Sequence, residues 1–228
     1  MKVLFLFPFL FWINLTLGQE SDSITITLVP VFNGERISLA EETSKPKNDT
    51  TQITALKFYL SNFQFIANEP PKGLSPSNYH LINLEESQSL VINLPTTKNQ
   101  SYDTLTFNVG IDSLTHVSGA MGGDLDPING MYWTWQSGYI NFKLEGTSPV
   151  CQSRENEFIY HIGGYQTPFQ TIQKIALPID SANSINVEVE LARLLIPEVL
   201  SGTNHIMSPG AQAVAFAKRF ENLFTIVK

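Results

Sequence analysis

The sequence is poor in cysteine, in basic residues and in long apolar runs. Cys151 is the only cysteine among the 228 residues, so no disulfide can form within the chain. Acidic residues outnumber basic ones by 21 to 14, which disfavours nucleic acid or an anionic membrane as a partner. Beyond residue 18 no apolar run approaches the about 20 residues that a membrane-spanning helix needs, so we expect no membrane insertion.

Familiar catalytic signatures are missing as well. The sequence has no G-x-S-x-G, Walker, H-E-x-x-H or C-x-x-C motif, which disfavours classical hydrolases and zinc peptidases. Asp124 and Asp126 offer hard oxygen ligands for calcium, but they lack the spacing of an EF-hand loop. A solvated turn closed by Pro127 is the favoured interpretation of this acidic pair.

The N-terminus is typical of an export signal. Lys2 precedes an apolar stretch, residues 3–13, and Gly18 is a small residue at the expected cleavage point. The stretch is too short, and too interrupted by polar residues, for a membrane anchor. We predict that residues 1–18 are a signal peptide and that residues 19–228 form one soluble domain outside the cytoplasm.

Alternation of period two dominates the rest of the sequence. In three segments every second residue is apolar, which is typical of half-buried strands: residues 104–109, 140–145 and 185–190. Less regular strands fit residues 24–32, 55–66, 79–83, 89–94, 157–162 and 169–177. About nine strands separated by turn-rich gaps favour an all-β antiparallel sandwich, Ig-like or similar, over a parallel sheet with crossover helices.

One short helix is predicted near the C-terminus. Ser208 can cap it and Pro209 suits its first turn. Apolar residues then follow at helical spacing: Val214, Ala215, Ala217, Phe220 and Leu223. We expect this helix to pack on the sandwich.

Cys151 lies in a polar stretch, residues 146–156, that reads as a loop. Its functional interpretations are a soft metal ligand or an intermolecular bridge. An incidental loop thiol is the favoured interpretation.

Aromatic residues gather between His116 and residue 146. Trp133 and Trp135 are two residues apart, so on a strand they would project to the same face and could stack beside a shared site. The simpler interpretation, which burial habits favour, is that both are large core residues.

Histidine and methionine recur in three places outside the expected signal. His116 precedes Met121, His161 precedes a Gly-Gly pair, and His205 stands two residues before Met207. Imidazole and thioether are ligands that suit copper, particularly in its reduced state. A single histidine on a strand is more often hydrogen-bonded than metal-bound, so the pattern alone leaves both interpretations open.

Several blocks together resemble the MbnP-like proteins, also called the metallo-mystery pair family. The most specific block is Met131-Tyr-Trp-Thr-Trp-Gln-Ser-Gly-Tyr139, which leads to Leu144-Glu-Gly146. Three weaker blocks follow the family's order along the chain: Phe58-Tyr-Leu-Ser-Asn-Phe63, His161-Ile-Gly-Gly164 and His205-Ile-Met-Ser-Pro209. The resemblance covers nearly all of residues 19–228.

The resemblance implies a copper-binding protein of the bacterial periplasm or exterior, and not an enzyme. It also implies a partner, a di-haem cytochrome c peroxidase-like protein of the MbnH type, which in relatives oxidises a tryptophan to kynurenine. Carried over by motif, Trp133 and Trp135 match the family's tryptophan pair and His161 matches the histidine before the glycine block. The further ligands that it suggests are His205, His116 and Met207, and the clustering of methionine near histidine adds Met121.

Two other functions fit the same residues. An exported interaction module would bind a carbohydrate or a protein through its aromatic segment, residues 132–139, without a metal. An enzyme that uses bound copper for redox chemistry would have the same sequence features. Copper titration separates the first of these from the copper-binding hypothesis.

Overall fold

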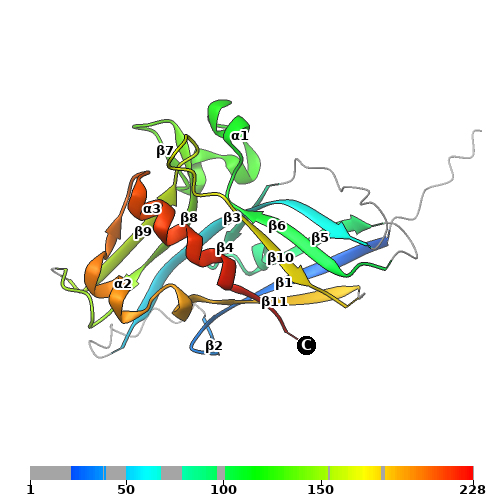
Figure 1. Cartoon of the computed structure of the whole chain (residues 1–228), viewed down its shortest axis with the longest axis horizontal. Coiled ribbons are helices and arrows are strands. Elements are labelled where there is room, and N and C mark those ends of the chain that lie inside the picture. Colours follow the sequence, from blue (N-terminus) through cyan, green and yellow to red (C-terminus); the bar gives the residue numbers. More distant parts are fainter. Residues whose placement is uncertain are drawn as a thin grey trace, which may run out of the picture.

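The computed structural model describes residues 22–37, 39, 50–67, 79–96, 101–153, 155–180 and 183–227. The predicted signal peptide, residues 1–18, lies outside these residues. In the described part, two sheets form a β-sandwich, and α1 (Ser113–Val117) sits among loops at one end of it (Figure 1). The predicted sandwich with a short C-terminal helix is confirmed. None of the helices in these ranges is long and apolar enough to cross a membrane.

The smaller sheet is organised around its first strand. Its strands are β1 (Asp22–Phe32), β2 (Glu35–Arg36), β5 (Val91–Thr96), β11 (Ser184–Glu190) and β13 (Phe224–Val227). They follow the order β13-β11-β1-β2, and β5 also pairs with β1. β1 and β11 run parallel, with Thr25 opposite Ser184. The sheet is therefore mixed, whereas the alternation pattern predicted an antiparallel one.

The larger sheet carries most of the residues discussed below. Its strands are β3 (Gln52–Ile66), β4 (His80–Asn83), β6 (Thr104–Val109), β7 (Tyr132–Trp133), β8 (Gly138–Thr147), β9 (Glu157–Gly163), β10 (Gln173–Pro178) and β12 (His205–Ile206). They follow the order β10-β6-β3-β8-β9-β12, with β4 on β3 and β7 on β8. The short β12 runs parallel to β9 and is the last strand at that edge of the larger sheet.

The main core fills the space between the two sheets. Alternation along β3 sends Leu56, Phe58 and Leu60 into this space, where each is fully buried. Phe58 stacks on Phe142 of β8 with ring centroids 5.3 Å apart. Burying a side chain of this size contributes about 1.5–3 kcal/mol, so the inner faces supply most of the stability.

The opposite, outer face of the larger sheet is covered at one end by the segment between β6 and β8. Tyr59 of β3 is fully buried there, in a second apolar cluster with Leu125, Met131, Trp133 and other residues. The Tyr59 hydroxyl donates a hydrogen bond of 2.9 Å to the carbonyl of Asp124. The far end of this outer face keeps its polar side chains partly exposed.

Short helices complete the structure: η2 (Ser87–Leu90), η3 (Gly123–Leu125), η4 (Pro127–Asn129), η5 (Leu191–Arg193), α2 (Pro197–Gly202), α3 (Ala211–Ala217) and η6 (Lys218–Asn222). α3 and η6 pack on the inner face of the larger sheet. Phe216 lies against Tyr160 at 4.5 Å and Phe220 against Phe142 at 4.6 Å between ring centroids. The helix therefore packs on the sandwich as predicted.

Several element boundaries differ from the predictions. α3 begins at Ala211 after an extended Gly210, because residues 208–210 form a bend that follows β12, so Ser208 is not its cap. β10 begins at Gln173, four residues later than predicted. β7 ends at Trp133, and a turn takes Trp135 off the strand.

Candidate metal site

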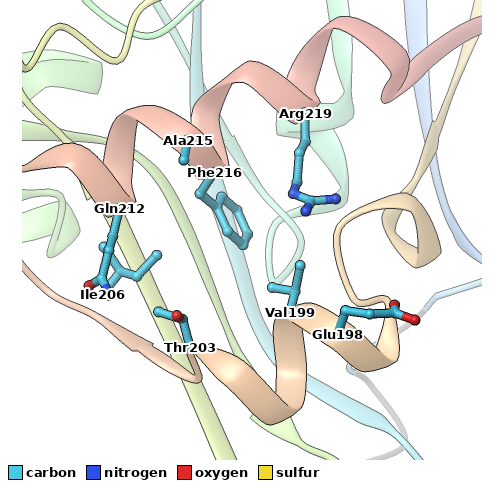
Figure 2. Close-up of a pocket in the computed structure, with 8 residues that line it drawn as sticks. All are labelled: Glu198, Val199, Thr203, Ile206, Gln212, Ala215, Phe216 and Arg219. Atoms are coloured by element: carbon cyan, nitrogen blue, oxygen red, sulfur yellow. The ribbon is translucent and has the colours of Figure 1, made fainter.

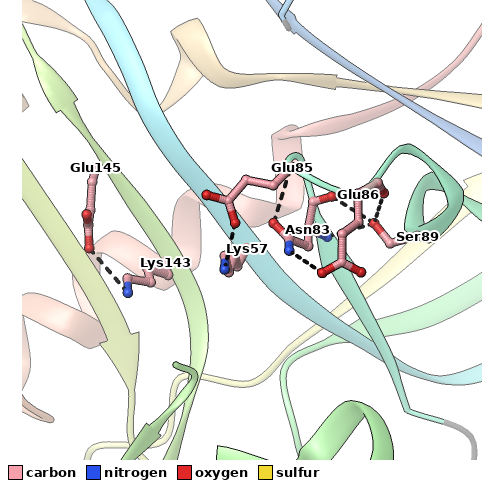
Figure 3. Close-up of polar contacts among 7 residues, drawn as sticks. All are labelled: Lys57, Asn83, Glu85, Glu86, Ser89, Lys143 and Glu145. Atoms are coloured by element: carbon pink, nitrogen blue, oxygen red, sulfur yellow. Dashed lines mark hydrogen bonds and ion pairs between the residues drawn. The ribbon is translucent and has the colours of Figure 1, made fainter. Parts of the chain in front are cut away.

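A row of polar side chains crosses the exposed end of the larger sheet's outer face. Lys57 of β3 stands opposite Lys143 of β8, which stands opposite His161 of β9. Two carboxylates compensate the neighbouring lysines, as Figure 3 shows: Lys57 pairs with Glu85 at 3.0 Å, and Lys143 pairs with Glu145 at 3.4 Å. The ion pair with Lys57 also holds the pKa of Glu85 below its usual value.

Glu145 has a second partner, which is His161. The Nε2 atom of His161 lies 2.6 Å from Oε1 of Glu145. Burial lowers the pKa of His161 below its usual value, although the Glu145 carboxylate acts in the opposite direction. The imidazole is therefore neutral at pH 7, and its Nε2–H donates to the carboxylate. Nδ1, which makes no hydrogen bond with a described residue, keeps a free lone pair.

His205 lies on the neighbouring strand. It stands opposite Ile159 in the parallel β9–β12 pair, and Ile159 and His161 are two residues apart on the same face of β9. The two histidines are close enough for the charge of His205 to lower the pKa of His161 further. Met207 follows two residues after His205 and is exposed. This corner of the sheet thus brings together two imidazoles, and an exposed thioether follows two residues further along the chain.

The tryptophan pair borders the same corner. Trp133 is 6% exposed and lies over Gly163, where an added Cβ would come within 2.5 Å of the indole ring. Gly163 and His161 occupy the same face of β9. Trp135 is 64% exposed, and its ring lies 5.9 Å from that of Trp133. The rings meet as predicted, although through a turn and not along one strand.

His116 lies deeper, under the hairpin that contains the tryptophans. Its Nδ1 accepts a hydrogen bond of 3.1 Å from the backbone N–H of Tyr139, and its ring stacks on Tyr165 at 4.6 Å. The side chain is 1% exposed, and burial lowers the pKa of His116 to about 4. Its Nε2 is buried without a hydrogen-bond partner among the described residues. The backbone N–H of Met121 donates to the Tyr139 hydroxyl at 3.0 Å. Met121 and His116 therefore both contact Tyr139.

The predicted ligands therefore fall into two groups, one around His161 and one around His116. Across the described ranges, no three His, Cys, Asp or Glu side chains form a group that could hold a metal ion. The chemistry of the donors is the better test of fit. A neutral histidine that donates its second N–H to a carboxylate is the usual arrangement of a metal-binding histidine, and His161 has it.

The comparisons with known proteins identify the family. A model of the MbnP family matches residues 21–209. The chain belongs to the MbnP family. Its structure resembles that of MbnP from Methylosinus trichosporium, with a TM-score of 0.56 and 14% identity over 86% of this chain and 88% of that one. At this identity the likeness shows a shared fold. No curated protein matches the chain.

Two residues of this MbnP-family protein escaped prediction from sequence. Glu145 was assigned to the polar side of a strand, but its contact with His161 depends on the register between β8 and β9. Tyr165 stacks on His116 from a loop that follows β9. No local spacing indicates either contact, because the residues involved are 16 and 49 positions apart in the chain.

Cys151 is in a loop, as predicted, but it is not an exposed thiol. It is 3% exposed and belongs to the main core cluster. Burial raises the pKa of its thiol above the usual value. A buried, protonated thiol is a poor metal ligand and a poor partner for a disulfide.

Proposed function

We propose that this MbnP-family protein binds copper on the outer face of its larger sheet, through Nδ1 of His161 and the imidazole of His205. The exposed thioether of Met207 is the further ligand nearest in sequence. The hydrogen bond between His161 and Glu145 carries the proposal, because it fixes the tautomer that leaves Nδ1 free. Imidazole and thioether donors suit copper better than they suit calcium or magnesium.

Copper titration of the purified protein tests this site. The double variant His161→Ala/His205→Ala should lose stoichiometric copper binding, while His80→Gln, which removes a histidine from another part of the sheet, should keep it. Calcium and magnesium should not compete. If the double variant binds copper as tightly as the parent, the site is wrong.

His116 and Met121 have a different place in this proposal. The Nδ1 atom of His116 accepts a hydrogen bond from the backbone N–H of Tyr139. We therefore propose that His116 supports the hairpin that carries the tryptophans. Its ligation of copper, and that of Met121, stays a prediction. A His116→Ala variant that loses copper while it remains folded would extend the ligand set to this residue.

The second part of the proposal concerns the tryptophan pair and a haem partner. We infer that Trp135, which is largely exposed, faces a di-haem cytochrome c peroxidase-like partner. We infer that Trp133 is the residue oxidised to kynurenine, with two equivalents of peroxide reduced at the partner as the oxidant and the C2 atom of the indole released as formate. The ring contact of 5.9 Å offers a short electron-transfer route between them. Trp133 is the better candidate for modification because it lies over Gly163, two residues from His161 on the same face of β9, where an added amine and ketone could change the metal site.

Mass spectrometry of two preparations tests this inference. Protein produced alone should contain intact Trp133 and Trp135, and protein produced with its haem partner should contain one altered residue at 133. Trp135→Phe should slow the conversion and Trp133→Phe should abolish it. Two unmodified tryptophans after co-production, with normal copper binding, would refute the modification.

We also propose that the protein is exported and acts as a binding protein and not as an enzyme. The predicted signal peptide and the membership of the MbnP family support this location. Cell fractionation should find a mature chain that begins near Gln19 in the periplasm or outside the cell. Intact protein that still begins at Met1 in the cytoplasm would contradict the proposal.

The exposure of Trp135 also favours a second function. An aromatic ring that is 64% exposed beside Trp133 is a suitable platform for a carbohydrate or a protein. In that case Trp135→Ala would abolish ligand capture in a binding assay with glycans or protein. The parent protein would show no stoichiometric uptake of copper.

A further inference from the structure

A cavity of about 230 Å³ lies between α2 and the α3–η6 helix, away from the residues assigned to copper. Figure 2 shows the phenyl ring of Phe216 at its centre, with Val199 across from it on α2. Ile206 of β12 also lines the cavity. Ile206 is buried while its neighbour His205 is exposed, so the cavity opens on the other face of β12 from the copper site.

Two opposite charges stand at one end of this cavity. Arg219 reaches down from η6 and Glu198 extends from α2 at the same end, as Figure 2 shows. They form no ion pair with each other, and within the described ranges neither side chain makes an ion pair or hydrogen bond with another residue. Thr203 and Gln212 supply polar atoms at the opposite end.

This arrangement fits a ligand that carries both charges at one end and an apolar body at the other. We propose that the cavity binds a free apolar amino acid, such as leucine. Its carboxylate would pair with Arg219 and its ammonium group with Glu198, while its side chain would lie between Val199 and Phe216. A residue at a peptide terminus lacks one of the two charges and an internal residue lacks both, so the free amino acid is the better match.

The size of the cavity agrees with this class of ligand. The cavity volume is about 230 Å³. Pockets for drug-sized ligands begin near about 300 Å³. The charged end is open to water, where each ion pair contributes little, so we expect a Kd on the order of 1 mM.

An NMR titration of the full exported chain with L-leucine tests the proposal. Saturable shifts of backbone amides in α2 and α3 are expected below about 20 mM ligand, well above the expected Kd. N-acetyl-L-leucine and L-leucinamide each lack one charge and should bind about two- to fivefold more weakly. Glycine, which has no side chain to occupy the apolar part, should also bind at least fivefold more weakly.

Matched variants locate the binding. Arg219→Met and Glu198→Gln should each weaken leucine binding about two- to fivefold, while Lys218→Met and Glu221→Gln, which change neighbouring charges outside the cavity, should not. Ala215 is exposed at the lining, so Ala215→Phe should fill the cavity and abolish binding without unfolding the protein.

Three outcomes would overturn the proposal: no saturable shift with leucine, equal binding of the acetylated or amidated compound, or unchanged binding in Arg219→Met. The variant His161→Ala/His205→Ala should bind leucine like the parent. Failure of the copper site is thereby distinguished from failure of this cavity.

Discussion

Glu145 determines which ring nitrogen of His161 is available to copper in the proposed site. Because its carboxylate accepts from Nε2–H of His161, the opposite ring nitrogen, Nδ1, keeps its lone pair for a metal ion. Burial would raise the pKa of Glu145, but the hydrogen bond from His161 and the charge of Lys143 bring it below its usual value. The carboxylate is therefore ionised at neutral pH and makes the imidazole more basic.

Glu145→Gln should lower the affinity for copper by about 10- to 100-fold, since a neutral amide accepts the same proton more weakly. The measurement is a competition titration with a copper chelator. Glu85→Gln is the control, because Glu85 pairs with Lys57 on the same face without touching a histidine. Equal copper affinities of Glu145→Gln and Glu85→Gln would show that Glu145 does not support the copper site.

His116 should make stability depend on pH. Its folded-state pKa is lowered to about 4 from 6.5, so between these values the unfolded chain binds a proton that the folded chain does not. The free energy of unfolding should therefore fall as the pH drops from about 6.5 to 4, by about 3 kcal/mol from this group.

His116→Asn tests this dependence, because the amide oxygen of Asn can accept from the Tyr139 N–H but does not titrate. Urea unfolding at several pH values should give a variant that is less stable at pH 7 and loses less stability on acidification. If parent and variant lose the same amount, His116 does not control the acid response.

At the scale of elements, one carboxylate joins the first hairpin to the strand beside it. Glu190, at the end of β11, accepts backbone hydrogen bonds from Asn33 at 3.0 Å, Gly34 at 2.9 Å and Ala192 at 2.9 Å. It thus fixes the β1–β2 turn against η5. Hydrogen bonds to a charged group are the stronger ones, although partial exposure reduces their contribution.

Glu190→Gln should lower the free energy of unfolding by about 1–2 kcal/mol, since an amide offers one acceptor atom in place of two. Glu188→Gln is the matched control, because Glu188 occupies the same face of β11 two residues earlier. Chemical denaturation of both variants provides the measurement. A loss no larger than that of the control would show that the turn holds without this contact.

Prediction from sequence succeeded where a local pattern decides the structure. Period-two alternation located β6, β8 and β11, because it reports which side chains are buried. It does not report which strands pair, so the parallel β1–β11 contact could not be predicted. It also does not report that Tyr59, on the outer face of β3, is buried by the segment between β6 and β8.

The same distinction applies to the candidate site. The motif around Trp133 and Trp135 predicted that the rings would meet, and they do. The sequence could not predict that Trp133 would lie over Gly163, or that Glu145 would reach His161, because both contacts depend on the β8–β9 register. Register is set by the whole sheet and not by neighbouring residues.

At the scale of the whole molecule, the rate at which the Cys151 thiol reacts measures global unfolding. Cys151 is buried in the main core, so a thiol reagent should react with it at least about 100-fold more slowly in the folded protein than in denaturant. The rate of labelling provides the measurement. In a Cys151→Ala background, Gln152→Cys places a thiol at the exposed neighbouring position and should react at once. Rapid labelling of the parent would show that this part of the core opens locally.

The parallel pairing of β1 with β11 also affects how the chain can be made. β1 is synthesised first, but one of its edges stays open until Ser184–Glu190 has been made, and β13 must then close the sheet next to β11. Contacts between such distant segments form slowly. The smaller sheet therefore cannot close until residues 184–227 have left the ribosome, and under the proposed export this delay would keep the chain able to thread through a secretion channel.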